Sequence, residues 1–538
     1  MNTHFFRVFL FAFLLLPSFF YVSGQEKIVK LDSVAIPQDT NKVEILSADR
    51  LTLLKINDTS TIQLLAGHVR LRQGKALFDC DSCVLNNGAN IFEAWQHIQL
   101  KDGDSIQVNA RHLLYLIDKK IAYLDGNVSL TDRKAVLTTP SLEYNLQTDI
   151  GTYTQGGKVI NKKTTLTSRE GYYYASLKEI YFKNQVQLID PAYRIHTDSL
   201  LYNTATQTNR FIAKTTIIDS SGRRIETRDG FYKGGKAEFN QRPVIIDGAT
   251  TITGDRIAFN DSTGTSQAIG NVVVIDTAQG TTLVTGQLFR EDKNERMLAT
   301  GKPLLIIKQD ADSLYLTADT IFTALQAAPV NKKDTNRVNQ TTRVSLAKKD
   351  SSLRYIEAFH HVKIFSDSLQ AVCDSLYYTD LDSAFRLFSN PVLWSKESQI
   401  SGDTIWLFTK YKKADRLTVF ENSLIVSEAG VGIYNQVGAI RMEGRFTLGS
   451  LDSVRAFGNA ETIYFLQEED SSYTGINESK SDLIDIYFMQ QALDRIVLRG
   501  MVSGTVWPIQ QKNPAAMRLP QFKWSDSRRP KSRQDLLQ

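Results

Sequence analysis

The chain has 538 residues, of which 42% are hydrophobic and 22% are charged. This composition is typical of a folded protein and excludes an intrinsically disordered chain. The net charge of +5 is concentrated near the C-terminus, where residues 512–533 alone carry a net +6. The rest of the chain therefore has no basic face of the kind that binds nucleic acid.

The N-terminal residues have the pattern of a secretory signal peptide. Arg7 precedes an apolar run from Val8 to Leu16, and Ser23-Gly24 supply small residues at the expected cleavage site. A membrane anchor is the alternative, but Pro17 interrupts an apolar segment that is already short. We expect residues 1–24 to be a signal peptide that directs export of the chain, and residues 25–44 to be a flexible lead-in.

From residue 45 onward, apolar and polar side chains alternate, which indicates β-strands with one buried face. The pattern is clearest in residues 104–130, where Gly126-Asn127 supplies a corner between two alternating runs. Corners recur about every 29 residues, a period typical of stacked repeats. They are marked by Gly67, Gln96, Gly126, Gly157, Asn184, Lys214, Gln241, Gly270, Gly301, His360, Ser389, Glu421, Gly458 and Gly500.

We therefore predict an all-β, elongated repeat stack of short strands. One rung per corner, with rungs about 4.8 Å apart, would make it roughly 65–70 Å long. The candidate inward residues, which would form either a core or an open apolar groove, are Val69, Leu71, Ile106, Val108, Val128, Leu130, Leu142, Tyr144, Val186, Leu188, Ile257, Phe259, Val272 and Val274. In the later repeats the alternation predicts that Leu424, Val426, Ile463 and Phe465 also face inward.

The repeat pattern divides the chain into regions. Residues 45–326 form a first repeat region and residues 354–507 continue it, while the polar residues 327–353 form an inserted loop or a linker between two domains. The periodicity ends after Trp507-Pro508, so residues 508–538 are expected to be a basic, flexible tail. That tail is either a solvated extension or a contact for an acidic lipid surface or partner.

Residues that could carry chemistry do not form a catalytic pattern. The histidines lack metal-ligand spacing, and adjacent His360-His361 would face opposite sides of a strand. An Asp recurs at the head of many strand runs, and this recurrence favours a turn-capping role over a catalytic one. Cys80 and Cys83 are interpreted as structural thiols, with a local disulfide or a metal knuckle as alternatives. We expect no enzyme activity, no cofactor and no metal.

Two phased motifs resemble the OstA-like family, which includes periplasmic bridge proteins of lipopolysaccharide transport. A Gly-Asn-Val corner occurs at Gly126-Asn127-Val128 and Gly270-Asn271-Val272. An Ala-Asp-x-Leu-x-Tyr-like run occurs at residues 47–51 and 318–322. The resemblance covers about residues 45–505, and it implies an exported β-jelly-roll or folded-ribbon stack whose apolar interior accepts lipid A acyl chains.

The function expected from this resemblance is a lipid-binding bridge in lipopolysaccharide transport and outer-membrane assembly. The resemblance also implies a location in the periplasm, with outer-membrane association as a further expectation. Its partners would be lipopolysaccharide or a related lipid, and other transport proteins that pair with exposed strand edges. Two alternatives remain open: an exported β-solenoid scaffold with a sealed core, and a carbohydrate-active β-helix. Alternation alone does not distinguish a closed core from an open groove.

Overall fold

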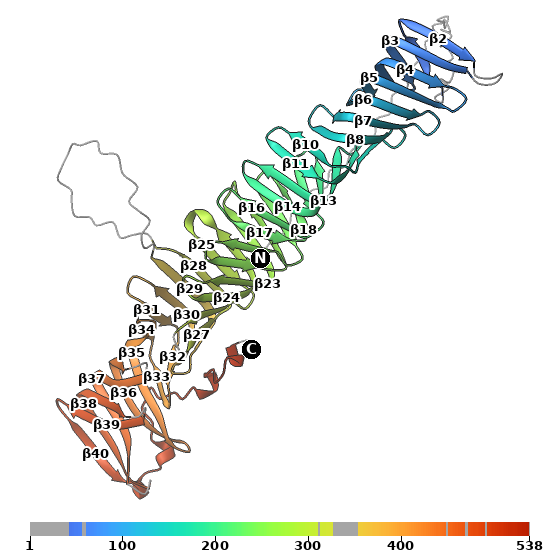
Figure 1. Cartoon of the computed structure of the whole chain (residues 1–538). Helices are drawn as coiled ribbons and strands as arrows, with labels where there is room; N and C mark the ends of the chain where they lie inside the picture. Colours follow the sequence, from blue (N-terminus) through green and yellow to red (C-terminus); the bar gives the residue numbers. More distant parts are fainter. Residues whose placement is uncertain are drawn as a thin grey trace, which may run out of the picture.

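The computed structural model describes residues 42–55, 61–309, 312–326, 353–447, 450–468, 472–489 and 492–536. These residues form a single antiparallel sheet of 40 strands, which is folded lengthwise into a long ladder (Figure 1). This confirms the predicted all-β repeat stack. The expected signal peptide, nearly all of the lead-in, and the expected insertion up to residue 352 lie outside the described residues. Among the described residues, no helix has the length and apolar character needed to cross a membrane.

The ladder has two arms that face each other across a shared interior. Sixteen bent strands contribute one half to each arm: β3 (Thr61–Gln73), β4 (Ala76–Asn86), β5 (Ile91–Asp102), β6 (Ile106–Leu116), β7 (Ile121–Thr131), β8 (Val136–Asn145), β13 (Glu179–Asp190), β14 (Tyr193–Asn203), β23 (Thr265–Asp276), β24 (Thr281–Glu291), β29 (Arg354–Phe365), β30 (Gln370–Thr379), β35 (Lys413–Gly430), β36 (Ile433–Thr447), β37 (Ser450–Gln467) and β38 (Tyr473–Met489).

Twelve shorter strands belong to one arm, called arm 1: β2 (Arg50–Lys55), β9 (Ile150–Tyr153), β12 (Glu170–Tyr174), β15 (Thr208–Phe211), β18 (Asp229–Lys233), β19 (Lys236–Asn240), β22 (Arg256–Asn260), β25 (Arg296–Thr300), β28 (Thr320–Leu325), β31 (Ala384–Phe388), β34 (Thr404–Lys410) and β39 (Ala492–Arg499).

Twelve others belong to arm 2: β1 (Glu44–Ser47), β10 (Gly157–Asn161), β11 (Thr164–Ser168), β16 (Thr215–Asp219), β17 (Arg224–Thr227), β20 (Val244–Asp247), β21 (Thr250–Thr253), β26 (Leu304–Lys308), β27 (Ser313–Thr317), β32 (Val392–Ser395), β33 (Ser398–Ser401) and β40 (Ser503–Pro508).

The corners found in the sequence are the bends at which the chain passes from arm 1 to arm 2. Twelve of the fourteen marked residues have a positive φ, and the exceptions are Lys214 and Gly157, whose neighbour Gly156 has a φ of 91°. The prediction that a corner separates two strands holds at some corners, such as Gly301 between β25 and β26, but not at others, such as Gly126, which lies inside the continuous strand β7. The return bend from arm 2 to arm 1, for example at Ala110-Arg111, has no positive φ, so the sequence pattern did not reveal it. Each period therefore adds two strands to each arm, and the ladder is roughly 130 Å long rather than 65–70 Å.

The C-terminal segment is packed against the sheet instead of forming the flexible tail that the sequence predicts. Residues 508–536 run back from β40 along the outer face of arm 2 (Figure 1), and we call them the strap. Its short 3-10 turns are η2 (Ile509–Gln511), η3 (Pro514–Ala516), η4 (Asp526–Arg528) and η5 (Gln534–Leu536). Leu519 and Leu536 of the strap are buried.

Glutamines of arm 2 hold the backbone of the strap. The Gln436 amide donates to the Met517 carbonyl at 2.9 Å and accepts from the Leu519 N–H at 2.9 Å. Gln399 does the same with Lys523 (2.6 Å) and Ser525 (2.7 Å). These contacts satisfy backbone groups that the strap cannot pair with itself.

The strap overturns one prediction about the core. Leu424, Val426, Ile463 and Phe465 were expected to face the interior between the arms, but they lie on the outer face of arm 2 in a separate apolar cluster with Leu519. Both faces of arm 2 are therefore buried in this region, and a strand buried on both faces gives no reliable alternation.

Candidate functional site

The fourteen predicted inward residues all lie in the interior between the arms. Each is less than 10% exposed, and Leu71, Val108, Tyr144, Leu188 and Val272 are completely buried. Most of them belong to the part of the ladder before β21, where side chains from the two arms fill the space between them. Sequence alternation thus located the interior correctly, although it could not show where that interior is open.

A row of tyrosines on arm 1 fills the interior near the tips of the two arms. Tyr115, Tyr144, Tyr173, Tyr202 and Tyr232 are 29 or 30 residues apart in sequence and occupy every second strand of one cross-strand row. All five are less than 10% exposed. Phe259 continues the row on β22. Large rings at this depth leave little free space between the arms.

Polar groups of arm 2 close the interior over this row. The Tyr144 hydroxyl donates to Asp102 at 2.9 Å, and the Tyr115 hydroxyl donates to Gln73. Burial raises the pKa of Asp102, and hydrogen bonds from Tyr144 and Lys75 oppose that shift only in part. These pairs connect the tip of arm 1 to the tip of arm 2, and they seal the early rungs.

A second polar cluster, around Asp132, connects the arms further along the ladder. Asp132 accepts from the Tyr173 hydroxyl at 3.1 Å and from Thr204 at 2.7 Å. Burial alone would raise the pKa of Asp132, but hydrogen bonds from the Ala135 N–H, Thr204 and other donors outweigh it and lower the pKa. The carboxylate is therefore held ionised by the groups that close this part of the interior.

The aromatic row is interrupted at the next two positions. The residues that follow Phe259 at every second strand are Arg290 on β24 and Thr323 on β28, and the row regains a tyrosine only at Tyr378. A cavity of about 500 Å³ opens between the arms at this interruption. Its apolar lining residues are Ile252, Val274, Leu283, Met297, Leu305, Ile307, Leu314, Ile321, Ile356, Tyr378 and Phe385.

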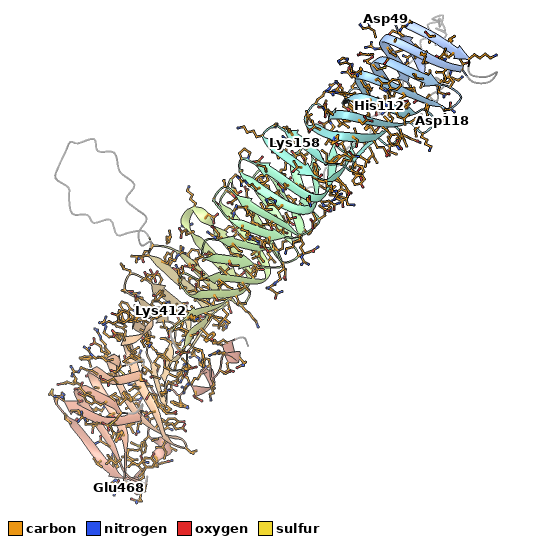
Figure 2. All side chains as sticks on the ribbon, in the orientation of Figure 1. Asp49, His112, Asp118, Lys158, Lys412 and Glu468 are labelled. Carbon is orange, nitrogen blue, oxygen red and sulfur yellow. The ribbon has the colours of Figure 1, made fainter. Side chains whose placement is uncertain are left out.

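The mouth of the cavity is bordered by charged and polar residues. Arg354 pairs with Glu295 on arm 1. The Lys412 ammonium donates to the Gln279 carbonyl at 3.2 Å, and the Gln309 amide donates to the Lys412 carbonyl at 2.6 Å. Lys412 lies between β34 and β35 (Figure 2). Its contacts with Gln279 and Gln309 connect arm 1 to arm 2 across the mouth. The site thus has an apolar interior and a polar rim.

Only one of the fourteen predicted residues, Val274, lines this cavity. Ile257 and Phe259 line a neighbouring space of about 50 Å³, and the others are packed core. Residues such as Leu305 and Leu314 were missed because they alternate like any other inward residue. The signal that could have found the site is the loss of the 29-residue tyrosine recurrence at Arg290 and Thr323.

The recurring aspartates hold neighbouring corners together. The Asp255 N–H donates to the Gly270 carbonyl at 2.8 Å, and its carboxylate accepts from the Asn271 side chain at 2.9 Å. Asp319 repeats this arrangement with His361, at 2.9 Å. The partner is thus the adjacent corner and not the turn that each Asp was expected to cap, but the role is structural in both cases.

The histidines and cysteines form no metal site among the described residues. His360 contacts Asp374 at 3.2 Å, and the two adjacent histidines therefore pair with different carboxylates. Cys80 and Cys83 are free, buried thiols. Both face the interior because the return bend between Asp79 and Ser82 reverses the alternation. Burial raises the pKa of Cys80 to about 12, which makes its thiol unreactive.

Comparisons with known proteins identify an OstA-like part of the chain. Residues 40–198 match the family model described as OstA-like protein. No curated protein matches the chain. Among solved structures, it is similar to LptH of Pseudomonas aeruginosa, the LptA homologous periplasmic component of a lipopolysaccharide transport device. That match has 16% sequence identity and a TM-score of 0.18, and it covers 19% of this chain and 79% of LptH.

Proposed function

We propose that this chain, which is OstA-like over residues 40–198, is a lipid-binding bridge in lipopolysaccharide transport and outer-membrane assembly. It would act in the periplasm after export by its signal peptide. The observation that carries the proposal is the apolar cavity of about 500 Å³ between the arms. Its volume lies within the range of known small-molecule sites, roughly 300–1,000 Å³.

The chemistry of the cavity suits an acyl chain. Transfer of an alkyl chain from water to an apolar environment gains about 0.8 kcal/mol per methylene. Leu283, Leu305 and Leu314 supply such an environment. The rim residues Arg354 and Lys412 can hydrogen-bond an anionic headgroup that stays in water.

The remainder of the proposed path is closed by the tyrosine row. For an acyl chain to move along the fourteen predicted inward positions, the polar contacts of Asp102 and Asp132 would have to open. Transport would therefore begin or end at the cavity, and movement toward the N-terminal rungs would require the two arms to separate.

The ends of the ladder suit the proposed partners. Among the described strands, β1 and β2 each pair with β3 alone, and Leu51 and Leu53 of β2 are 50% and 62% exposed. At the other end, β39 and β40 each pair with β38 and with no other strand of the described residues. Unpaired edges with exposed apolar residues can add a strand from another transport protein.

An exported β-solenoid scaffold without a groove is the second candidate function. The observation that favours it is the closed interior from β3 to β20, where Val108, Tyr144 and Leu188 have no exposed surface. On that account the cavity is a packing defect and the outer surfaces of the arms bind partners.

Photocrosslinking in cells tests the proposal. A photoreactive residue replaces Leu283 or Leu305 in the cavity, Val108 in the closed interior, or exposed Arg70 on an outer face. We expect lipid adducts from the cavity positions and none from Arg70. If both cavity variants fold but neither forms a lipid adduct, the scaffold function is favoured.

A further inference from the structure

A second hollow lies on the outside of the molecule, where the outer face of arm 1 curves between β34 and β38. It has a volume of about 460 Å³. None of the described residues that line it also lines the cavity between the arms. Its wall includes the aromatic side chains of Trp406, Phe408, Phe420 and Tyr487. We call it the outer pocket.

The outer pocket carries an excess of positive charge. Four arginines and two carboxylates line it: Arg416, Arg441, Arg445, Arg455, Glu443 and Asp485. The carboxylates are already engaged, since Glu443 pairs with Arg441 at 2.5 Å and Asp485 pairs with Arg455 at 2.6 Å. Asp485 is also bonded to Arg499, at 3.0 Å. Among the described lining residues, no carboxylate is left over for Arg416 or Arg445.

Arg416 and Arg445 are directly opposite each other on neighbouring strands β35 and β36. Like charges in this position destabilise a sheet, and their Cβ atoms are about 5 Å apart. Arg445 is exposed and forms an ion pair with none of the described carboxylates. The carboxylate paired with Arg416 is Asp415, its own neighbour in sequence, at 3.6 Å. An anion between the two guanidinium groups would remove the repulsion.

Two of the four arginines, Arg416 and Arg441, lie over aromatic rings. The Arg416 guanidinium lies 4.6 Å from the centre of the Phe408 ring, and that of Arg441 lies 5.4 Å from the Phe420 ring. Stacking engages the flat face of a guanidinium and leaves its N–H donors free in the plane. The fork of donors on Arg416, held in this way, matches the oxygens of a phosphate group.

We propose that the outer pocket binds a phosphate ester, with Arg416 and Arg445 as its principal ligands. This site is separate from the cavity between the arms and does not depend on the function proposed for that cavity. The phosphate can belong to a soluble sugar phosphate or to a phospholipid headgroup, because both present the same group to the arginines.

Calorimetric titration of the full chain tests this site. Glucose 6-phosphate is the probe and glucose is its uncharged counterpart. The pocket variant is R416Q/R445Q, and the matched control is R210Q, an exposed arginine of β15 on the outer face of the same arm. We expect glucose 6-phosphate to bind and glucose not to bind. The dissociation constant should rise at least tenfold in the pocket variant only, and it should rise with ionic strength.

Vesicles distinguish the two sources of phosphate. Binding to phosphatidylglycerol vesicles, but not to phosphatidylcholine vesicles, that is lost in R416Q/R445Q assigns the pocket to a lipid headgroup. Binding of glucose 6-phosphate alone assigns it to soluble esters. The proposal is overturned if R416Q/R445Q and R210Q bind equally. It is also overturned if the full chain binds neither glucose 6-phosphate nor phosphatidylglycerol vesicles. The single variant R445Q removes an exposed side chain that pairs with none of the described carboxylates, and it replaces the double variant if the latter does not fold.

Discussion

Thr323→Tyr should restore the interrupted tyrosine row and reduce the cavity. Thr323 lines the cavity on β28, at the position that tyrosine occupies at residues 115, 144, 173, 202 and 232. A tyrosine ring there would bury roughly 100 Å² more apolar surface than threonine. At about 25 cal/mol per Å², this surface is worth ~2.5 kcal/mol. The ordering of the new side chain costs about 1 kcal/mol, so we expect a net stabilisation of about 1–2 kcal/mol.

Two assays follow the effect of Thr323→Tyr. Urea unfolding should show a higher transition midpoint, and binding of a fluorescent fatty acid should weaken at least tenfold because the ring occupies the space of the acyl chain. Thr282→Tyr is the matched control, since Thr282 pairs with Ile275 and Ile306 on the outer face of arm 2. Stabilisation with unchanged fatty-acid binding would refute the assignment of the cavity as the binding site. Destabilisation would refute the role given to the tyrosine row.

Three further changes test other parts of the account. Gln399→Ala leaves the Ser525 N–H and the Lys523 carbonyl of the strap without their partner. It should lower the free energy of unfolding by about 1–3 kcal/mol and speed proteolysis within the strap. An unchanged rate of proteolysis would contradict this. The pKa of Asp132 is lowered in the folded state, so its contribution to stability is present at neutral pH and is lost as the pH falls below about 4. Asp132→Asn should therefore flatten the dependence of the unfolding free energy on pH, measured between pH 3 and 7. An unaltered pH dependence would count against this role of Asp132. Leu53→Lys places a charge on exposed strand β2 and should abolish edge-to-edge association in sedimentation experiments with little change in stability; association that persists would show that another surface is used.

Much of the fold could be predicted because the two periods in the sequence have direct physical causes. Alternation follows from the pleat of a strand, and it correctly placed Val108 and Leu188 in the interior. The recurrence of corners follows from the positive φ that Gly126 and Gly270 adopt with little strain. The return bends have ordinary φ values and no required residue type, so the number of rungs per period was underestimated.

The location of the cavity could not be predicted from alternation, because an inward residue gives the same sequence pattern whether its side chain is packed against another or lines a cavity. The strap was missed for a related reason. Its contacts depend on Gln370, Gln399 and Gln436, which are far from it in sequence and look like ordinary outward polar residues. Arg529 of the strap, for example, donates to Gln370 at 2.8 Å. Only the folded arrangement shows that these side chains share one face.

Native mass spectrometry of the chain purified from envelope membranes tests the central claim most directly. The wild-type protein should retain a lipid, and the variant R290Y/T323Y, which restores both missing rings at the cavity, should lose it while remaining folded. Equal lipid retention by the two proteins would contradict the claim that this cavity holds acyl chains, as would a wild-type protein that carries no lipid.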